Sequence, residues 1–428
     1  MKSLIIKGGL IYEITETGGR LIKKDILIEN GKILKLGKNL GRAGAEIVDA
    51  HNLLVSPGFI DIHSHLREPG QERKEDIRSG TISAIAGGFT SIACMPNTTP
   101  VIDSVTLLLD LKERIKRSAL IKVYPIASIT KGEMGAEPAD FSGLAKCGAY
   151  GFSDDGKGVT NSAIMREAFE FSARTSIPIL AHEEDPSLSK DGVMAEGNIS
   201  SKLGFPSIPV SAEASMIARD IILAEETGGH LHICHVTTKP SLALIHFAKN
   251  MNIKVTAEVT PHHLILNDRQ IIKTNISPNT KMKPPLMPET HRVKLVESLN
   301  TDIIDCIATD HAPHTPEEKS RGFMEAPFGV IGFETAFPIL YTHLVLKNKI
   351  SLEKLLEKMT IRPARILNIP AGILKPNFPA DIVLIDLNYK WQVSENFFSR
   401  SKNSPFIGWK VKGKIVKVFV DGELRFKI

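Results

Sequence analysis

The sequence predicts an α/β protein whose main unit is a (β/α)8 TIM barrel, and three observations carry this prediction. From residue 58 to residue 365, short β-branched runs alternate with segments of helical periodicity, which is typical of βα units repeated around a parallel sheet. Eight strand-like runs can be counted, and eight strands close this kind of barrel. Metal-binding types of side chain follow several of these runs, at the end where barrel enzymes place their active sites.

The predicted strands are short and rich in apolar or β-branched residues, and they cover residues 58–63, 89–95, 121–127, 148–153, 177–182, 230–235, 253–259 and 303–310. Helical patterns fill most of the intervals between them. Residues 105–118 repeat leucine at helical spacing, residues 162–176 form a second such pattern, and residues 212–229 end in two glycines, which favour a helix stop.

The two ends of the chain have a different character from the middle. Both carry short strand-like runs separated by turns, and we expect these runs to pair with each other. The predicted division is therefore an N-terminal β segment over residues 1–57, the barrel over residues 58–365, and a C-terminal β segment over residues 366–428.

Composition excludes several classes of protein. The 428 residues are 42% hydrophobic and 24% charged, which is ordinary for a globular chain and unlike disordered or fibrous ones. The net charge of +5 is mild and no dense basic block occurs, so we expect no nucleic-acid partner. No apolar run reaches the roughly 18 residues of a membrane span, and the start lacks a signal-peptide pattern, so we expect a cytoplasmic protein without a membrane segment.

The cysteines are interpreted as reduced, buried thiols rather than as disulfides or a cysteine zinc site. They are widely spaced in apolar runs, at Cys94, Cys147, Cys234 and Cys306.

His63 and His65 are the first residues that point to metal chemistry. They lie two positions apart at the end of a predicted strand, so their side chains project to the same side and could hold one metal. Alone, such a pair is more often hydrogen-bonded and structural than a metal site.

Further metal-ligand types follow other predicted strands, namely Asp154, Asp155, His182, His235 and Asp310. Imidazole and carboxylate together suit a zinc-like ion, and a bridging carboxylate allows two ions about 3.5–4 Å apart to share a hydroxide. The alternatives are that His182 is a hydrogen-bonded core histidine and that Asp154 caps a loop.

Four further histidines are weighed separately. His230 and His232 fall on the opposite strand face from His235 and are expected outside the site. His262 and His263 follow the seventh strand and are candidates for groups that support the ligands.

A series of segments resembles the dihydroorotases of the amidohydrolase superfamily, of the longer class I type found in bacteria and archaea. The segments are PGFIDIHSHLREPG, AGGFTSIACMPNTTP, FSDDG, HICHVTTK, EVTPHHL, IATDHAPH and APFGVIGFETA, in family order over essentially the whole chain. The resemblance implies a (β/α)8 barrel and a small composite β-sandwich made from the two end segments.

The resemblance also implies a metal-ligand set for Zn2+, with one or two ions per subunit and two favoured. His63, His65 and Asp310 are expected on the first metal, His182 and His235 on the second, and Asp155 between them, with Asp154 as the fallback. Many relatives bridge with a carboxylated lysine, but residues 148–156 contain none, and Lys157 is expected to be a solvated loop residue.

For the substrate, the resemblance implies that Arg67, Asn97 and His314 hold the ring's carboxylate and that Phe328 and Gly329 line the ring. An ion pair of Arg67 with Glu68 or Glu72 is the alternative. Where relatives usually carry Asn and Arg, this chain has Lys283 and Met287, so the contact that Lys283 makes with the substrate stays open. The polar loop 315–326 is a candidate mobile lid.

The activity implied by the resemblance is the reversible hydrolysis of (S)-dihydroorotate to N-carbamoyl-L-aspartate in pyrimidine (UMP) biosynthesis, with Asp310 as the catalytic proton carrier. Two alternatives stay open. One is a dihydropyrimidinase- or allantoinase-like enzyme for a neutral ring. The other is a non-catalytic homologue that assembles with aspartate transcarbamoylase. Relatives also suggest a homodimer.

Overall fold

The centre of the protein is a ring of parallel strands in the computed structural model, which describes residues 3–15 and 18–428. The ring contains two hydrogen-bonded sheets. One holds β6 (Phe59–Ser64), β7 (Phe89–Cys94) and β8 (Lys122–Pro125). The other holds β9 (Ile179–Ala181), β12 (Leu231–Ile233), β13 (Val255–Val259) and β14 (Cys306–Ile307).

Isolated bridges join the two sheets and close the barrel. Phe152 bridges both Ala127 and Ile179 on one side, and Ser64 bridges His311 on the other. Seven of the predicted strands are confirmed, but the strand expected at 148–153 is reduced to the single bridging residue Phe152. The glycines in this run explain the difference, because glycine weakens a strand. A Cβ at Gly151 would come within 2.4 Å of the Leu180 side chain.

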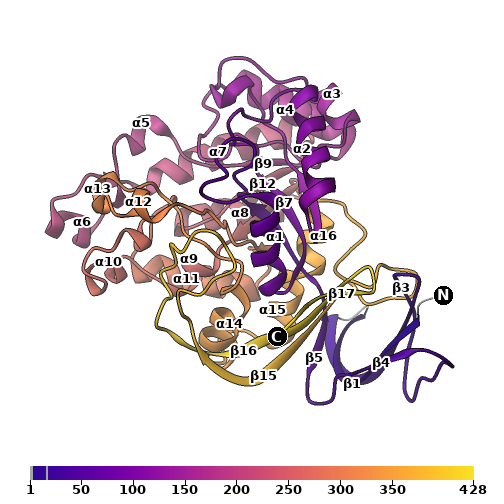
Figure 1. The fold of residues 1–428 in the computed structure, drawn as a ribbon. Helices are drawn as coiled ribbons and strands as arrows, with labels where there is room; N and C mark the ends of the chain where they lie inside the picture. Colours follow the sequence, from indigo (N-terminus) through magenta and orange to yellow (C-terminus); the bar gives the residue numbers. More distant parts are fainter. Residues whose placement is uncertain (1–2, 16–17) are drawn as a thin grey trace.

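Helices surround the ring and alternate with its strands along the chain (Figure 1). The helical patterns at 105–118, 162–176 and 212–229 are confirmed as α2, α4 and α7, and Gly228 ends α7 in the left-handed conformation with φ 76°. The helices are α1 (Ile77–Ala86), α2 (Val105–Ser118), α3 (Phe141–Lys146), α4 (Ser162–Thr175), α7 (Val210–Thr227), α8 (Lys239–Asn250), α11 (Glu289–Asn300), α14 (Ala336–Leu340), α15 (Leu352–Met359) and α16 (Ile361–Ile366).

Short elements lie between the longer helices. Among them, α5, α6, α10, α12 and α13 gather on the side of the molecule away from β1, β4 and β5 (Figure 1). The loop 315–326 contains α12 and α13, and its role as a lid stays a prediction. These short elements are α5 (Pro186–Ser189), α6 (Asn198–Leu203), α9 (Pro261–Ile265), α10 (Arg269–Lys273), α12 (Pro316–Lys319), α13 (Gly322–Glu325), β10 (Met194–Ala195), β11 (Ser207–Ile208), η1 (Lys131–Glu133), η2 (Pro278–Thr280) and η3 (Tyr341–Val345).

The two ends of the chain form one sheet, as predicted. Strand β5 from the N-terminal segment pairs antiparallel with β15 from the C-terminal segment, and the sheet encloses its own apolar core, which includes Ile6, Ile26 and Ile382. Its strand order is β17 (Glu423–Lys427), β16 (Lys410–Val420), β15 (Ile382–Gln392), β5 (Leu54–Pro57), β1 (Ser3–Thr15), β2 (Gly18–Glu29) and β3 (Lys32–Gly37), with β4 (Glu46–Asp49) paired to β1.

The cysteines follow the prediction of buried thiols at all positions except one. All four cysteines are free; three are buried and Cys147 is partly exposed. In the part of the chain that the structure describes, no helix combines the length and the apolar character that a bilayer crossing requires.

Candidate active site

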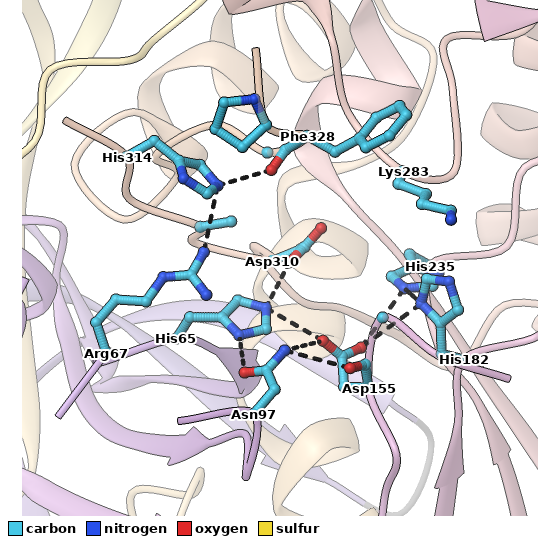
Figure 2. A pocket seen from close by; sticks show the side chains of 14 residues that line it. His65, Arg67, Asn97, Asp155, His182, His235, Lys283, Asp310, His314 and Phe328 are labelled. Carbon is cyan, nitrogen blue, oxygen red and sulfur yellow. Dashed lines mark hydrogen bonds and ion pairs between the residues drawn. The ribbon is translucent and has the colours of Figure 1, made fainter. Parts of the chain in front are cut away.

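A cavity of about 340 Å³ lies at the carboxyl ends of the barrel strands and collects nearly all of the predicted site residues (Figure 2). His63 is the exception, because its fully buried side chain lies among the ligand candidates without lining the cavity. The predicted site residues that line it are His65, Arg67, Asn97, Asp155, His182, His235, Lys283, Asp310, His314, Phe328 and Gly329.

Asp155 lies at the centre of the predicted metal ligands. Its Oδ1 lies 3.1 Å from His63 Nε2, 3.7 Å from His182 Nδ1 and 3.9 Å from His235 Nε2, and its Oδ2 lies 3.4 Å from His65 Nε2. One carboxylate therefore faces all four histidines.

The remaining distances divide the ligands into two groups. Asp310 Oδ1 lies 3.0 Å from His65 Nε2 and 3.7 Å from His63 Nε2. On the other side, His182 Nδ1 lies 3.0 Å from His235 Nε2. The residues predicted for one ion, His63, His65 and Asp310, thus lie together, and so do His182 and His235; their binding of two ions stays a prediction.

The chemistry of these donors fits a metal centre. His63 Nε2 and Asp155 Oδ1 are buried, lie 3.1 Å apart, and have no hydrogen-bond partner among the described residues. Buried polar atoms are normally hydrogen-bonded, so two facing atoms of this kind fit a site that binds a cation between them. Imidazole nitrogens with carboxylate oxygens are a donor set that zinc prefers.

The charges of the two key ligands also suit a cation. Burial alone would raise the pKa of Asp155, but the neighbouring charge of His63, the nearby ring of His182 and the charge of His65 hold that pKa well below its usual range. Burial, followed by the charges of His182 and His63, lowers the pKa of His235 well below its usual value. Asp155 is therefore ionised and His235 neutral, which are the forms that bind metals.

Asp154 points away from the cluster and caps a neighbouring loop. Its Oδ1 accepts hydrogen bonds from the backbone N–H groups of Ile129 (2.7 Å) and Thr130 (3.0 Å), and its Oδ2 accepts one from the Thr130 hydroxyl. The loop-capping alternative thus describes Asp154, and of these two adjacent aspartates only Asp155 faces the histidines. Lys157 is exposed, as expected.

Three site residues have left-handed backbone conformations, with φ 60° at Arg67, 34° at His235 and 46° at Asp310. Such conformations are costly for residues with side chains and persist where the surroundings fix them. The Asp310 N–H donates to the carbonyl of His63 (3.0 Å), which ties the two edges of the barrel together at the site.

Two buried carboxylates below the ligands were missed by the sequence analysis. Asp61 Oδ1 accepts from the backbone N–H groups of His63 and Thr309, each at 3.1 Å, and Glu258 contacts the His63 ring. The sequence did contain a signal for them, because each is a charged residue inside an otherwise apolar strand. A charged side chain is rarely buried unless it is paired, so each predicted a buried partner.

The four extra histidines lie outside the cavity. His230 and His232 hydrogen-bond to Thr256 on the neighbouring strand. His232 is not remote from the site, however, because its Nε2 lies 3.1 Å from Glu258, which also contacts the His63 ring. His263 lies 2.9 Å from the carbonyl oxygen of Pro284 and supports the loop that carries Lys283, while His262 is buried beside it.

Arg67 lies at the opposite end of the cavity from His182 and His235 (Figure 2). It is buried and donates to the carbonyl of Pro313 (3.2 Å), but no carboxylate in residues 3–15 and 18–428 lies within ion-pair distance of it. Glu68 and Glu72 pair with Arg114, so the alternative ion pair is not formed. A buried guanidinium without an anion is costly unless a ligand supplies one.

The other predicted substrate contacts differ in how available they are. His314 lies 3.4 Å from Arg67 and 2.7 Å from the carbonyl of Phe328, and burial followed by the charge of Arg67 lowers its pKa. Asn97 is already engaged, because it accepts from His65 Nδ1 (2.9 Å) and donates to Asp155 Oδ2 (3.1 Å). It therefore holds two metal-ligand candidates in this structure.

Lys283 does not extend freely into the cavity. Its Nζ lies 2.8 Å from Glu184 Oε1 and 5.5 Å from the centre of the Phe328 ring. The charge that replaces the usual asparagine is therefore largely balanced by a neighbouring carboxylate. Gly329 has φ 120°, and a Cβ there would lie 2.7 Å from the Ala312 Cβ, so the close approach requires glycine.

The barrel and its rim of histidines and carboxylates define a cyclic amidohydrolase, and comparisons with known proteins agree. The family described as Dihydro-orotase-like matches residues 52–241. A dihydroorotase of Bacillus cytotoxicus is 45% identical over 407 residues, covering 95% of each chain, and one of Bacillus thuringiensis is 45% identical over 410 residues, covering 96% of this chain and 95% of that protein. The chain belongs to the dihydroorotase family.

Solved structures support the same fold. The L-hydantoinase (dihydropyrimidinase) of Arthrobacter aurescens superposes with a TM-score of 0.89 at 25% identity and covers 99% of this chain and 96% of its own. The dihydropyrimidinase of Brevibacillus agri gives a TM-score of 0.85 at 22% identity, covering 99% and 94%, which shows the fold alone.

Adjacent aspartates provide a matched test of the metal site. We expect Asp155→Asn to bind less metal than the parent, because a neutral amide is a poorer metal ligand than a carboxylate. Asp154→Asn should keep the metal content and lose about 1–3 kcal/mol of unfolding free energy through its weakened loop cap. Elemental analysis and thermal unfolding of both variants check this. Full metal content in Asp155→Asn would contradict the assignment.

Proposed function

We propose that the protein is a zinc-dependent dihydroorotase that interconverts (S)-dihydroorotate and N-carbamoyl-L-aspartate in cytoplasmic pyrimidine (UMP) biosynthesis. The observation that carries this proposal is the buried Arg67, which has no carboxylate partner in the described part of the chain and shares a cavity with the metal-ligand candidates. Arg67 lies at one end of this cavity and His182 and His235 lie at the other (Figure 2). A ring that carries a carboxylate on one side and a scissile amide on the other fits between them. The dihydroorotase names of the relatives support the same substrate.

The proposed ligands are His63, His65 and Asp310 for one ion and His182 and His235 for the other, with Asp155 shared. When bound, zinc ions supply a water whose pKa is near neutral and polarise the carbonyl of the amide. The donor set and its unpartnered buried atoms support this assignment.

The residues of the chain then have separate tasks. Arg67, with His314 beside it, binds the ring's carboxylate, and Phe328 lines the ring. Asp310, which lines the cavity next to His65, accepts the proton of the attacking water and delivers it to the ring nitrogen as the carbon–nitrogen bond breaks. In the reverse direction Asp310 accepts a proton from the ureido nitrogen as the ring closes and passes it to the departing hydroxyl of the carboxylic acid, which leaves as water.

A hydrolase for a neutral ring is the second candidate, because the solved neighbours carry the names hydantoinase and dihydropyrimidinase. Arg67 disfavours it, since a neutral ring would leave the buried guanidinium without an anion. The convergence of six metal-ligand candidates disfavours a non-catalytic homologue.

Association with a second copy of the chain or with aspartate transcarbamoylase is also part of the proposal, and the family resemblance is its support. Lys283 is also proposed to contact the substrate, but it contributes less to binding the carboxylate than Arg67 does, because Glu184 offsets its charge.

Asp310→Asn should lower the turnover of dihydroorotate by about 10²- to 10⁴-fold, the usual contribution of a proton-transferring group. Asp110→Asn, on the outer helix α2, is the control and should keep parent activity. Steady-state rates of purified, metal-loaded proteins provide the measurement. Turnover of Asp310→Asn within tenfold of the parent would show that Asp310 does not carry the proton.

Arg67→Gln should lower kcat/KM for dihydroorotate by about 10- to 100-fold, the effect of losing a hydrogen bond between charged groups. The parent should act poorly on dihydrouracil, hydantoin and allantoin, and Arg67→Gln should not weaken those low rates further. Arg166→Gln, an exposed control, should match the parent. A parent enzyme that prefers a neutral ring would favour the second candidate instead.

A further inference from the structure

Glu258 is a fully buried carboxylate on the central strand β13, directly below the two groups of metal-ligand candidates. It does not line the cavity and therefore cannot contact the substrate. One of its oxygens is nevertheless bonded to two residues of the site, and these bonds give it a role that the mechanism above does not assign.

The first bond is to a ligand of the first metal position. Glu258 Oε1 lies 2.6 Å from His63 Nδ1, across 195 positions of sequence. A carboxylate at this distance accepts the Nδ1–H, which fixes the tautomer and the ring orientation of His63 and leaves Nε2 as the atom that faces Asp155.

The second bond is to a ligand of the other metal position. The same Oε1 accepts the backbone N–H of His235 at 3.2 Å. His235 has φ 34°, a conformation that costs free energy unless its surroundings hold it. One oxygen atom thus orients the ring of His63 and the backbone that carries His235.

The other oxygen is held from below by a chain of hydrogen bonds. Glu258 Oε2 lies 3.1 Å from His232 Nε2, His232 Nδ1 lies 2.9 Å from Thr256 Oγ1, and the same hydroxyl lies 2.8 Å from His230 Nε2. The chain fixes the carboxylate in place, so the two strands β12 and β13 present it to the ligands in a single orientation.

We propose that Glu258 is a positioning residue that couples the two metal positions, because it holds one ligand of each through a single oxygen atom. The inference rests on the proposed function in requiring a two-metal centre. Its alternative is a buried carboxylate that only stabilises the barrel.

The test compares zinc affinities of the full-length chain by chelator competition. Glu258→Gln removes the charge and leaves only one accepting oxygen at similar size, so both ions should bind about 10- to 100-fold more weakly. Glu334→Gln is the matched control, since Glu334 is a largely buried carboxylate that accepts from Ser83, Phe398 and Ser399 elsewhere in the fold. It should bind zinc like the parent.

A second variant keeps the test decisive if Glu258→Gln folds poorly. His232→Leu leaves the Glu258 charge in place and, of the hydrogen bonds to Glu258, removes only the one that Oε2 accepts, so zinc affinity should fall by about 3- to 10-fold, the effect of one lost hydrogen bond. The visible spectrum of the cobalt-substituted protein reports ligand geometry directly and should change in both variants, whereas a residue with only a structural role would leave it unchanged.

The outcomes are distinct. Weakening of both ions in the two variants, with Glu334→Gln unchanged, supports the coupling. Weakening of one ion alone overturns it, and so do parent affinities and cobalt spectra in both variants. A parent chain that binds no zinc would instead overturn the proposed metal-dependent function itself, and the coupling with it.

Discussion

The site depends on one buried carboxylate, Asp155, that is shared by four histidines from distant parts of the chain. Its oxygens lie 3.1–3.9 Å from ring nitrogens of His63, His65, His182 and His235. Only a closed parallel barrel brings these strand ends to one rim, which is why the two bridges that Phe152 makes and the bridge from Ser64 to His311 matter for function. If the barrel were open at either place, these side chains would not meet at one rim.

The cavity separates two kinds of charge. At one end, aspartates and histidines gather as candidate metal ligands. At the other end lies the buried guanidinium of Arg67, which could bind an anionic group of a ligand. Asp310 lies between them in Figure 2. Among the described residues, His63 Nε2 and Asp155 Oδ1 have no hydrogen-bond partner, and Arg67 has no carboxylate within ion-pair distance. A substrate with a carboxylate and an amide on one ring matches both requirements at once.

Much of the fold and the convergence of the candidate ligands at one rim could be predicted from sequence, because strand ends are marked by a change from apolar to polar residues and barrel sites form at those ends. The contacts between distant residues could not. Glu258 meets His63 across 195 positions, and Lys283 meets Glu184 from another loop. The sequence pattern also does not show that Asn97 is already hydrogen-bonded to His65 within the site. Nor does it show that the strand predicted at 148–153 is reduced to one bridging residue.

The most direct test of the account measures metal content and dihydroorotate hydrolysis on one preparation, before chelation, after chelation and after zinc is restored. The account predicts two ions per chain in the active protein, loss of hydrolysis with the ions, and its return with them. Full turnover of dihydroorotate by protein that retains no metal would contradict it.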